Sequence, residues 1–283
     1  MPEAPEAEAL ASFLRTRLAG HAVTEVELVE GRALKTRARP LDELIGRAVT
    51  AVTRHGKHID LDLDGVHLSL GFGRAGWATW EDPPEVEAEP ALPPVAALIA
   101  RVVFDDGVLG VTDAGEWLSV QLHVADAADD VPSVAKLGPD AADPAYSRAM
   151  LAEAVSGRRK QLKALLQEQE TLAGIGNAYS DEILFAARLS PVVHAASLSD
   201  DEISRLWSAL HDTMTAAVIA RRGVPIAEQK AAKVRAMRVH GRAGEPCPDC
   251  GGLIEDIPGT KGGGQWCPAC QAPIETSDHA TPG

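Results

Sequence analysis

The sequence lacks any long apolar run, any export signal and any excess of basic residues. No stretch approaches the roughly 20 apolar residues that cross a bilayer. The opening Met-Pro-Glu-Ala-Pro-Glu has neither the basic nor the apolar region of a secretory signal. We therefore expect a cytoplasmic protein with no membrane partner. The apolar fraction of 45% and the charged fraction of 24% are ordinary for a folded chain, which excludes a disordered or collagenous protein.

Basic residues are in the minority, with 27 Lys and Arg against 41 Asp and Glu, a net charge of -14. Taken over the whole chain, this argues against a polyanion such as DNA as partner. The excess is local, however: residues 1–154 hold 13 basic against 26 acidic residues, whereas 155–245 hold 13 against 10. The distribution permits a local anion site, and the overall acidity predicts weak attraction to intact duplex.

The apolar pattern divides the chain into two halves. Leu10, Phe13, Leu14 and Leu18 recur at helical spacing and predict an amphipathic first helix that Gly20 can end. Short alternating or β-branched runs then predict antiparallel strands, with hairpin signals at residues 64–65 and 106–107. These strands are expected over 23–29, 48–52, 59–63, 67–72, 101–104 and 108–112. Helical periodicity follows over 146–156, 158–169, 178–189 and 199–221.

The four cysteines form two C-x-x-C pairs near the C-terminus, Cys247 with Cys250 and Cys267 with Cys270, sixteen residues apart. This spacing is typical of a four-cysteine zinc site, and the tail has few large apolar residues with which to fold unaided. The alternatives are an iron site of rubredoxin type and two disulfides, which are not expected without an export signal. A zinc ion held by four thiolates has no open position, so its role is structural.

A glycine turn at residues 172–177, Leu-Ala-Gly-Ile-Gly-Asn, joins two predicted helices. Asn177 is a suitable N-cap for the second helix, and the glycines let backbone amides approach an anion there. A DNA phosphate suits that place, and basic residues at 158–163 lie on the preceding helix. The alternative is a plain helix hairpin with a glycine turn.

The N-terminus offers a possible nucleophile. Removal of Met1 would leave Pro2 as a free secondary amine, and an α-amino group with a pKa near 7.7–8.0 is partly unprotonated at neutral pH. Such an amine can attack the anomeric carbon of a sugar, and the neighbouring Glu3 can act as acid or base. The alternative is an exposed acidic terminus. Lys57, in a tight turn between strands, is by default a surface lysine.

Five separated segments together resemble the bacterial formamidopyrimidine-DNA glycosylase and endonuclease VIII family over nearly the whole chain. They are, in order, residues 1–8, 54–57, 137–140, 169–182 and 239–247. The resemblance implies an α+β protein that begins with an antiparallel β-sandwich domain carrying a leading helix. The implied divisions are the sandwich over 1–136, a linker over 137–143, a helix-two-turn-helix domain over 144–240, a zinc ribbon over 241–273 and a flexible tail over 274–283.

The resemblance also implies roles for individual residues. It makes Pro2 the Schiff-base nucleophile, Glu3 the proton donor, and Lys57 a phosphate contact that donates a proton during elimination. Phosphate-binding positions in the helical domain match Asn177, Arg159 and Lys163, and Lys261 is the only cation available where the family's ribbon carries an arginine.

Other positions depart from the family pattern. Glu116 stands where an arginine is expected, beside Trp117, which could stack in the gap left by a flipped base. Leu70 or Phe72 would have to replace a methionine wedge. The glycine-rich lid is missing from residues 223–235.

These features predict a bifunctional DNA glycosylase and AP lyase that acts on damaged or abasic DNA as a monomer. Because Lys261 is a poor replacement for arginine, we expect cutting mainly by β-elimination. The first alternative is a non-catalytic DNA-damage-binding protein that keeps the fold, and a zinc-ribbon RNA-binding protein is the second.

Overall fold

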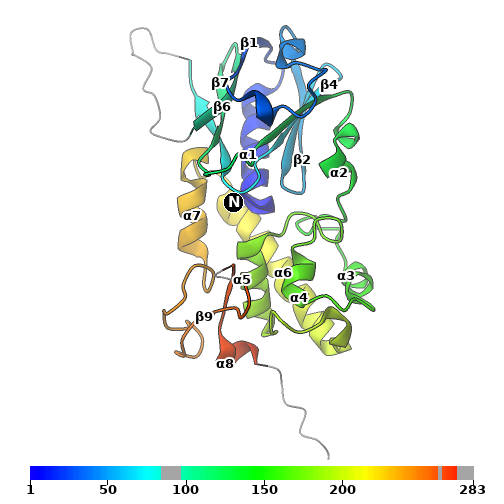
Figure 1. The fold of residues 1–283 in the computed structure, drawn as a ribbon, viewed down its shortest axis with the longest axis vertical. Coiled ribbons are helices and arrows are strands. Elements are labelled where there is room, and N and C mark those ends of the chain that lie inside the picture. The colour runs from blue at the N-terminus through cyan, green and yellow to red at the C-terminus, as the bar shows by residue number, and fades with distance from the viewer. Residues whose placement is uncertain (84–96, 261–262, 273–283) are drawn as a thin grey trace, which may run out of the picture.

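The computed structural model describes residues 1–83, 97–260 and 263–272 (Figure 1). Its first element is the predicted amphipathic helix, α1 (Ala4–Leu18), whose apolar residues Leu10, Leu14 and Leu18 are fully buried. Gly20 follows the end of α1 with φ of +80°, a conformation that glycine adopts at little cost. The helix packs against strand β2 (Val49–His55) and against the long helix α6 (Asp200–Arg221), so it contacts both halves of the chain.

Two four-stranded antiparallel sheets follow and form a sandwich, with strand orders β1-β6-β7-β5 and β2-β3-β4-β8. The predicted α+β class, with a leading helix and an N-terminal β-sandwich, is confirmed. Strands β5 and β8 were not among those expected from the sequence. The bounds are β1 Val23–Leu28, β2 Val49–His55, β3 His58–Leu63, β4 Val66–Gly71, β5 Gly76–Glu81, β6 Ala97–Phe104, β7 Gly107–Asp113 and β8 Gln121–Ala125.

The two hairpin signals differ in outcome. Asp64 and Gly65 both have positive φ, +50° and +78°, and join β3 to β4 as a two-residue turn. In the second hairpin, Phe104 pairs with Gly107, so the turn consists of Asp105 and Asp106 rather than residues 106–107.

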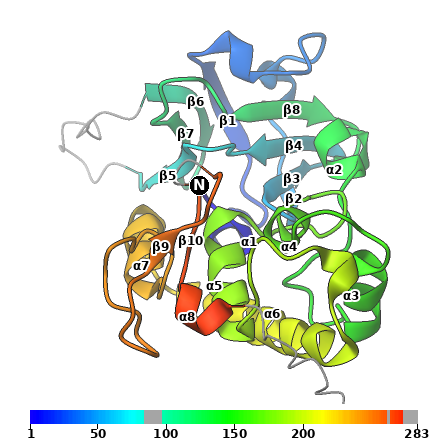
Figure 2. The same ribbon diagram turned by 60° about the horizontal axis from the view of Figure 1, so that its bottom comes forward.

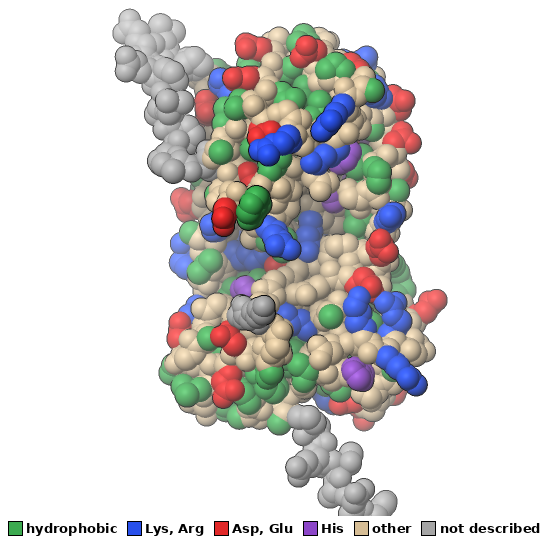
Figure 3. Space-filling view, viewed as in Figure 1, with side chains coloured by type: hydrophobic (Ala, Val, Ile, Leu, Met, Phe, Trp, Pro, Cys, Tyr) green, Lys and Arg blue, Asp and Glu red, His purple; other side chains and the backbone are tan. Residues whose placement is uncertain are grey.

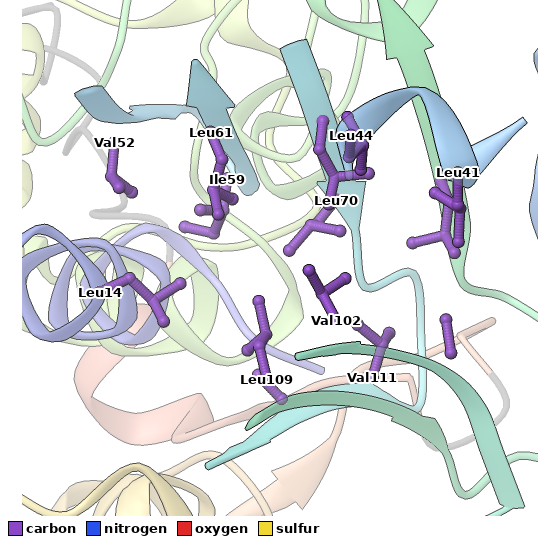
Figure 4. Close-up of a cluster of buried hydrophobic side chains, with 14 of the residues drawn as sticks. Leu14, Leu41, Leu44, Val52, Ile59, Leu61, Leu70, Val102, Leu109 and Val111 are labelled. Atoms are coloured by element: carbon purple, nitrogen blue, oxygen red, sulfur yellow. The ribbon is translucent and has the colours of Figure 1, made fainter. Parts of the chain in front are cut away.

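The core of the sandwich lies between the inner faces of the two sheets and α1 (Figure 4). Ile59, Leu61 and Leu63 alternate along β3 and are fully buried there. On the other sheet, Val102 of β6 and Leu109 of β7 point toward them. The period of two in the sequence therefore becomes the inner face of a sheet.

The second half of the chain is helical and lies below the sandwich, with the short ribbon strands β9 and β10 beside α5 and α7 (Figure 2). Helices α3 and α4 are shorter than expected, and α7 was not predicted. Among the described residues, no helix is both long and apolar enough to span a membrane. The bounds are α2 Pro132–Ala135, α3 Arg148–Val155, α4 Leu162–Leu166, α5 Asn177–Ala187, α6 Asp200–Arg221, α7 Gln229–Ala236, β9 Glu255–Asp256, β10 Gln265–Trp266 and α8 Pro268–Gln271.

The two halves are joined by packing and by an ion pair network. Ala4 belongs to the hydrophobic cluster of the helices, and Ile226 of the helical half belongs to that of the sandwich. Arg54, at the end of β2, pairs with Glu8 of α1 at 2.9 Å and with Asp140 of the connecting segment. A largely buried guanidinium held by two carboxylates fixes the β2–β3 turn, which carries Lys57, against both halves.

Candidate active site

The carboxylate of Glu3 lies at the N-terminus of helix α5. Glu3 is only 1% exposed, and it accepts hydrogen bonds from the backbone N–H groups of Gly176, of Ala178 at 3.0 Å and of Tyr179 at 3.3 Å. These amides have no partner within the helix, and the helix dipole favours a negative charge at this point. The prediction of Asn177 as N-cap is wrong, because Gly176 is the N-cap and α5 begins at Asn177.

The two glycines before α5 make room for the N-terminal segment. A Cβ atom on Gly176 would lie 2.6 Å from Cδ of Glu3, and one on Gly174 would lie 2.7 Å from Cβ of Ala4. Gly174 also has φ of +96°, and its carbonyl accepts a hydrogen bond from the backbone N–H of Ala4 at 2.9 Å. The anion that these glycines admit is therefore the carboxylate of Glu3, where the sequence had suggested a DNA phosphate.

Two acids and two cations are buried together here and form what we call the Glu3 cluster: Glu3, Glu6, Arg221 and Lys233. The Nζ atom of Lys233 lies 3.0 Å from Oε1 of Glu3 and 3.0 Å from Oε2 of Glu6. Nε of Arg221 lies 3.7 Å from Oε1 of Glu6, which also accepts a hydrogen bond from the hydroxyl of Tyr179 at 2.8 Å. Buried charges are costly unless they are paired, and here the two signs balance.

The surroundings of Glu3 keep it ionised. Burial raises its pKa, but the positive charges of Lys233 and Lys57, with the hydrogen bonds from Lys233 and Ala178, outweigh burial and hold the pKa below its ordinary value. Burial lowers the pKa of Lys57 to about 8, with Glu3 opposing and Lys233 assisting that shift. The terminal amine of Met1 also has a lowered pKa, first because of burial and then because of Lys233. Glu3, Lys57 and the chain terminus thus interact electrostatically, and the half-buried Pro2 lies beside them.

The four predicted DNA contacts differ in placement. Arg159 is exposed, and Asn177 is half-buried with its side-chain oxygen bonded to Gln167 at 3.1 Å. Lys163 is buried: its ammonium pairs with Asp181 and donates to the carbonyl of Asn177 at 3.1 Å. The structure therefore does not bring Lys163 to the surface, but uses it to hold the start of α5. Lys261 lies outside the described residues.

Sequence reasoning missed two members of the Glu3 cluster that bind Glu3 directly. Glu6 could have been found, because an acid three residues after Glu3 matches a capping box, and Oε2 of Glu6 accepts a hydrogen bond from the N–H of Glu3 at 3.0 Å. Lys233 gave no such signal, because lysine is usually exposed and its partners lie some 230 residues away.

Comparison with known proteins agrees with this geometry. Residues 1–114 match the formamidopyrimidine-DNA glycosylase N-terminal domain, and residues 137–227 match the formamidopyrimidine-DNA glycosylase H2TH domain. The formamidopyrimidine-DNA glycosylase of Geobacillus kaustophilus is 32% identical over 96% of this chain and 100% of its own length. That of Moorella thermoacetica is 32% identical over 91% of this chain and 94% of its own length.

The chain belongs to the formamidopyrimidine-DNA glycosylase family. Solved structures agree: the MutM (Fpg) protein of Thermus thermophilus superimposes with a TM-score of 0.79 at 29% identity, covering 95% of this chain and 98% of that one. The Lactococcus lactis enzyme, solved with DNA containing an AP site, shares the fold with a TM-score of 0.81 at 24% identity, covering 96% of this chain and all of the other.

The segments in which this glycosylase family member departs from the expected pattern can now be placed in the fold. Leu70 and Phe72 are each 1% exposed and belong to the sandwich core, so neither can replace the methionine wedge without leaving that core. Glu116 and Trp117 are exposed in the loop between β7 and β8, and Trp117 is 80% exposed. In place of a glycine-rich lid, residues 229–236 form helix α7.

The four cysteines of this glycosylase family member lie together, with all four sulfur atoms within 4.8 Å of one another. Cys247 Sγ lies 3.8 Å from Cys270 Sγ, and Cys250 Sγ lies 3.5 Å from Cys267 Sγ. Zinc–sulfur bonds of about 2.3 Å in a tetrahedron place sulfurs about 3.8 Å apart, so the cluster fits a zinc ion. The four cysteines would hold the zinc and stabilise the ribbon, with no open position for a reaction.

The ribbon is docked on α5 by two buried acids of that helix. Glu182 accepts hydrogen bonds at 2.9 Å from the backbone N–H groups of Arg238, Val239 and His240, which lead into the ribbon. Asp181 accepts one from the N–H of Gln265 in β10 at 3.0 Å. The helix that receives Glu3 therefore also positions the metal site.

We expect Gly176→Ala to displace the carboxylate of Glu3, because the new Cβ would lie 2.6 Å from its Cδ atom. The predicted loss of stability is about 2 kcal/mol, typical of overpacking in a buried site, and urea unfolding measures it. Gly31→Ala is the control, since nothing lies within 4 Å of a Cβ at that exposed position. Equal stabilities of the two variants would contradict the close approach of Glu3.

We expect one zinc ion per chain and no iron, measured by metal analysis of the purified protein. Denaturation with a chelator should release the zinc and expose four reactive thiols, because every cysteine of the chain lies in this cluster. The variant Cys267→Ser should have a lower zinc content and a ribbon that is sensitive to protease. Full-length chains with two disulfides and no metal would overturn the assignment.

Proposed function

We propose that this family member is a DNA glycosylase with AP lyase activity that uses Pro2 as its nucleophile and cuts mainly by β-elimination. The observation that carries the proposal is the buried, ionised carboxylate of Glu3, fixed to helix α5 directly after Pro2 and within the electrostatic reach of Lys57. The carboxylate of Glu3 stabilises the fold at this position. The adjoining amine and the lowered pKa of Lys57 are, in addition, features typical of an acid–base site.

The chemistry follows from the protonation states. After removal of Met1, the Pro2 amine would attack C1′ of the lesion sugar, and the ionised Glu3 would accept the proton that the amine must lose. As the N–C1′ bond forms, the bond from C1′ to the base breaks, and Glu3 could return this proton to the departing base or to the ring oxygen, which is its predicted role as proton donor. Breaking of the bond between C1′ and the ring oxygen then leaves an iminium, which acidifies the C2′ hydrogen. Transfer of that proton to a base, for which the again ionised Glu3 is available, breaks the C3′–O bond and releases the strand that carries the phosphate. Lys57, with a pKa of about 8, can donate a proton near neutral pH.

DNA is the proposed partner, and the charge of the surface supports it. Lys and Arg side chains gather around a hollow between the upper and lower parts of one face (Figure 3). Among the predicted contacts, the exposed Arg159 and the half-buried Asn177 are proposed to bind phosphates, while the buried Lys163 supports Asn177 through its carbonyl. Lys261 is proposed as the ribbon's phosphate contact. A protein monomer suffices for this arrangement, because every proposed site residue belongs to one chain.

Trp117 is proposed to stack in the space that a flipped nucleotide leaves. The ends of its loop are held together by hydrogen bonds. The carboxylate of Asp113 accepts them from the N–H groups of Ser119 at 2.7 Å and Val120 at 3.0 Å. The hydroxyl of Ser119 in turn accepts one from the N–H of Arg74 at 3.0 Å. An exposed indole on a fixed loop can enter a duplex without unpacking the core.

Covalent catalysis predicts that borohydride traps the native protein on an abasic-site oligonucleotide, because reduction makes the iminium permanent. Pro2→Gly should reduce trapping strongly, and protein that keeps Met1 should give no adduct. The adduct is measured by denaturing electrophoresis, and mass spectrometry of the protein establishes the state of the N-terminus.

Strand cleavage in the same assay should give mostly the β-elimination product. A native protein that binds abasic DNA but forms no adduct at any pH would instead be a damage-binding protein. A dominant one-nucleotide gap with phosphate at both ends would contradict the preference for β-elimination.

Stacking by Trp117 predicts that Trp117→Ala binds abasic-site duplex roughly 5- to 150-fold more weakly, because stacking on a base contributes about 1–3 kcal/mol. Binding to intact duplex should change less, and Trp117→Phe should retain most of the affinity. Fluorescence anisotropy of labelled duplexes at one fixed salt concentration measures all three. Equal affinities of the native and alanine proteins for the abasic duplex would exclude the stacking role.

A further inference from the structure

Helix α7 is held in place at its start by contacts with both halves of the protein. The side chain of Gln229 donates to the carbonyls of Arg221 and Val224, both at 3.0 Å, which closes the turn after α6. Trp77 of the sandwich donates to the carbonyl of Ile226 at 2.8 Å, directly before the helix. The helix is thus a fixed element beside the N-terminus (Figure 1).

Only one cation of α7 points into the protein. Lys230 and Arg235 are exposed, whereas Lys233 is buried and its Nζ atom bonds Glu3, Glu6 and the carbonyl of Met1, the last at 3.2 Å. The same atom lies 4.7 Å from the centre of the Tyr179 ring. The contact with Met1 disappears when Met1 is removed, so in the processed chain this ammonium is held by the carboxylates of Glu3 and Glu6.

We propose that Lys233 is a positioning residue that keeps Glu3 ionised and holds it beside the terminal amine, so that Glu3 can accept the proton of that amine. The inference rests on the proposed function, because nucleophilic attack by Pro2 depends on an ionised Glu3 and Lys233 is proposed to keep Glu3 ionised. Lys233 touches the N-terminal segment but no reacting atom of the sugar, and it acts through Glu3.

The groups that face Glu3 leave Lys233 as its direct cationic partner. Glu6 and Arg221 pair with each other, and Lys57 acts on Glu3 through space without a hydrogen bond among the described contacts. Removal of Lys233 would leave two carboxylates sharing the one buried guanidinium. The charged and titratable groups around Glu3 are Glu6 of α1, Lys57 of the β2–β3 turn, Tyr179 of α5, Arg221 of α6, Lys233 of α7 and the terminal amine.

The sign of the expected pH effect follows from the positive charge of Lys233. Lys233 lowers the pKa of Glu3 and, in the chain that keeps Met1, that of the Met1 amine. A nearby positive charge disfavours any protonated amine, so loss of Lys233 should raise the pKa of Glu3 and that of a Pro2 amine at the same place. Glu3 must be ionised and the amine unprotonated for attack. In Lys233→Met the acidic limb of the pH–rate profile should therefore move upward by about one pH unit or more, as expected for loss of an opposite charge at hydrogen-bond distance.

The test is single-turnover cleavage of abasic-site duplex between pH 5 and pH 9. We expect Lys233→Met to lose more rate at pH 6 than at pH 8, while Lys233→Arg keeps the native limb. Arg235→Met, an exposed cation two residues away, is the matched control and should leave the profile unchanged. A loss of rate in Lys233→Met that is equal at every pH would reduce Lys233 to a structural role and overturn the proposal.

A second readout does not depend on activity. A lowered pKa of Glu3 contributes stability above the unfolded value near 4.3, and that contribution disappears as the pH falls through the folded value. The difference in Tm between native protein and Lys233→Met should therefore be largest at neutral pH and shrink toward pH 3. A difference in Tm that is independent of pH would contradict the proposed role of Lys233. Failure of the native protein to form an adduct would contradict only the proposed function, so the two failures can be told apart.

A second pair of variants guards against misfolding of Lys233→Met. Glu6→Gln is compared with the double variant Glu6→Gln/Lys233→Met, in which the buried charges balance again. The double variant keeps one buried acid, Glu3, and one buried cation, Arg221. Its acidic limb should still lie above that of Glu6→Gln alone. Coincident limbs for these two variants would overturn the proposal in the same way.

Discussion

The fold depends on one carboxylate that closes the chain on itself. Glu3 satisfies the free amides at the start of α5, more than 170 residues further along the sequence. Two glycines before α5 have no room for a side chain because the N-terminal segment occupies that space. The position of Pro2 is consequently fixed by the same contacts that join the sandwich to the helices. Stability and chemistry are coupled at this point, since a change that loosens Glu3 moves the proposed nucleophile as well.

The net charge of -14 does not come from the buried ion pairs. Glu3 and Glu6 face Lys233 and Arg221 inside the protein, and Asp140 faces Arg54. The acids and cations of these pairs cancel, so the excess of acid is carried by the rest of the chain. On the face drawn in Figure 3, several Lys and Arg side chains gather around the hollow. A protein of this charge attracts intact duplex weakly at long range, so its selectivity has to come from contacts that a distorted or abasic site makes possible.

Local sequence patterns predicted the elements whose stability is local. The alternation of the strands, the spacing of the cysteines and the hairpin turn after β3 all depend on neighbours in the sequence, and they were found. Features that depend on distant partners were not. Asn177 looked like an N-cap because the competing carboxylate of Glu3 lies at the other end of the chain. Lys163 was expected at the surface because a lysine is rarely buried without a partner. Its partner, Asp181, offsets the cost of removing the ammonium from water, and only the fold brings the two side chains together. Lys233 belongs to a helix held by polar contacts, which has no apolar period to reveal it.

Helix α5 connects the metal site to the N-terminus without any chemistry at the metal. Its first turn binds Glu3, and Asp181 and Glu182, about one turn further on, bind the backbone of the ribbon and its approach. A ribbon that lost its zinc would leave these two buried acids without their amide partners, which is costly for a charged group. The strain would fall on the same helix that holds the proposed catalytic carboxylate. A closed four-thiolate site would therefore affect the proposed chemistry indirectly, because the ribbon that it stabilises binds α5 and the first turn of α5 binds Glu3.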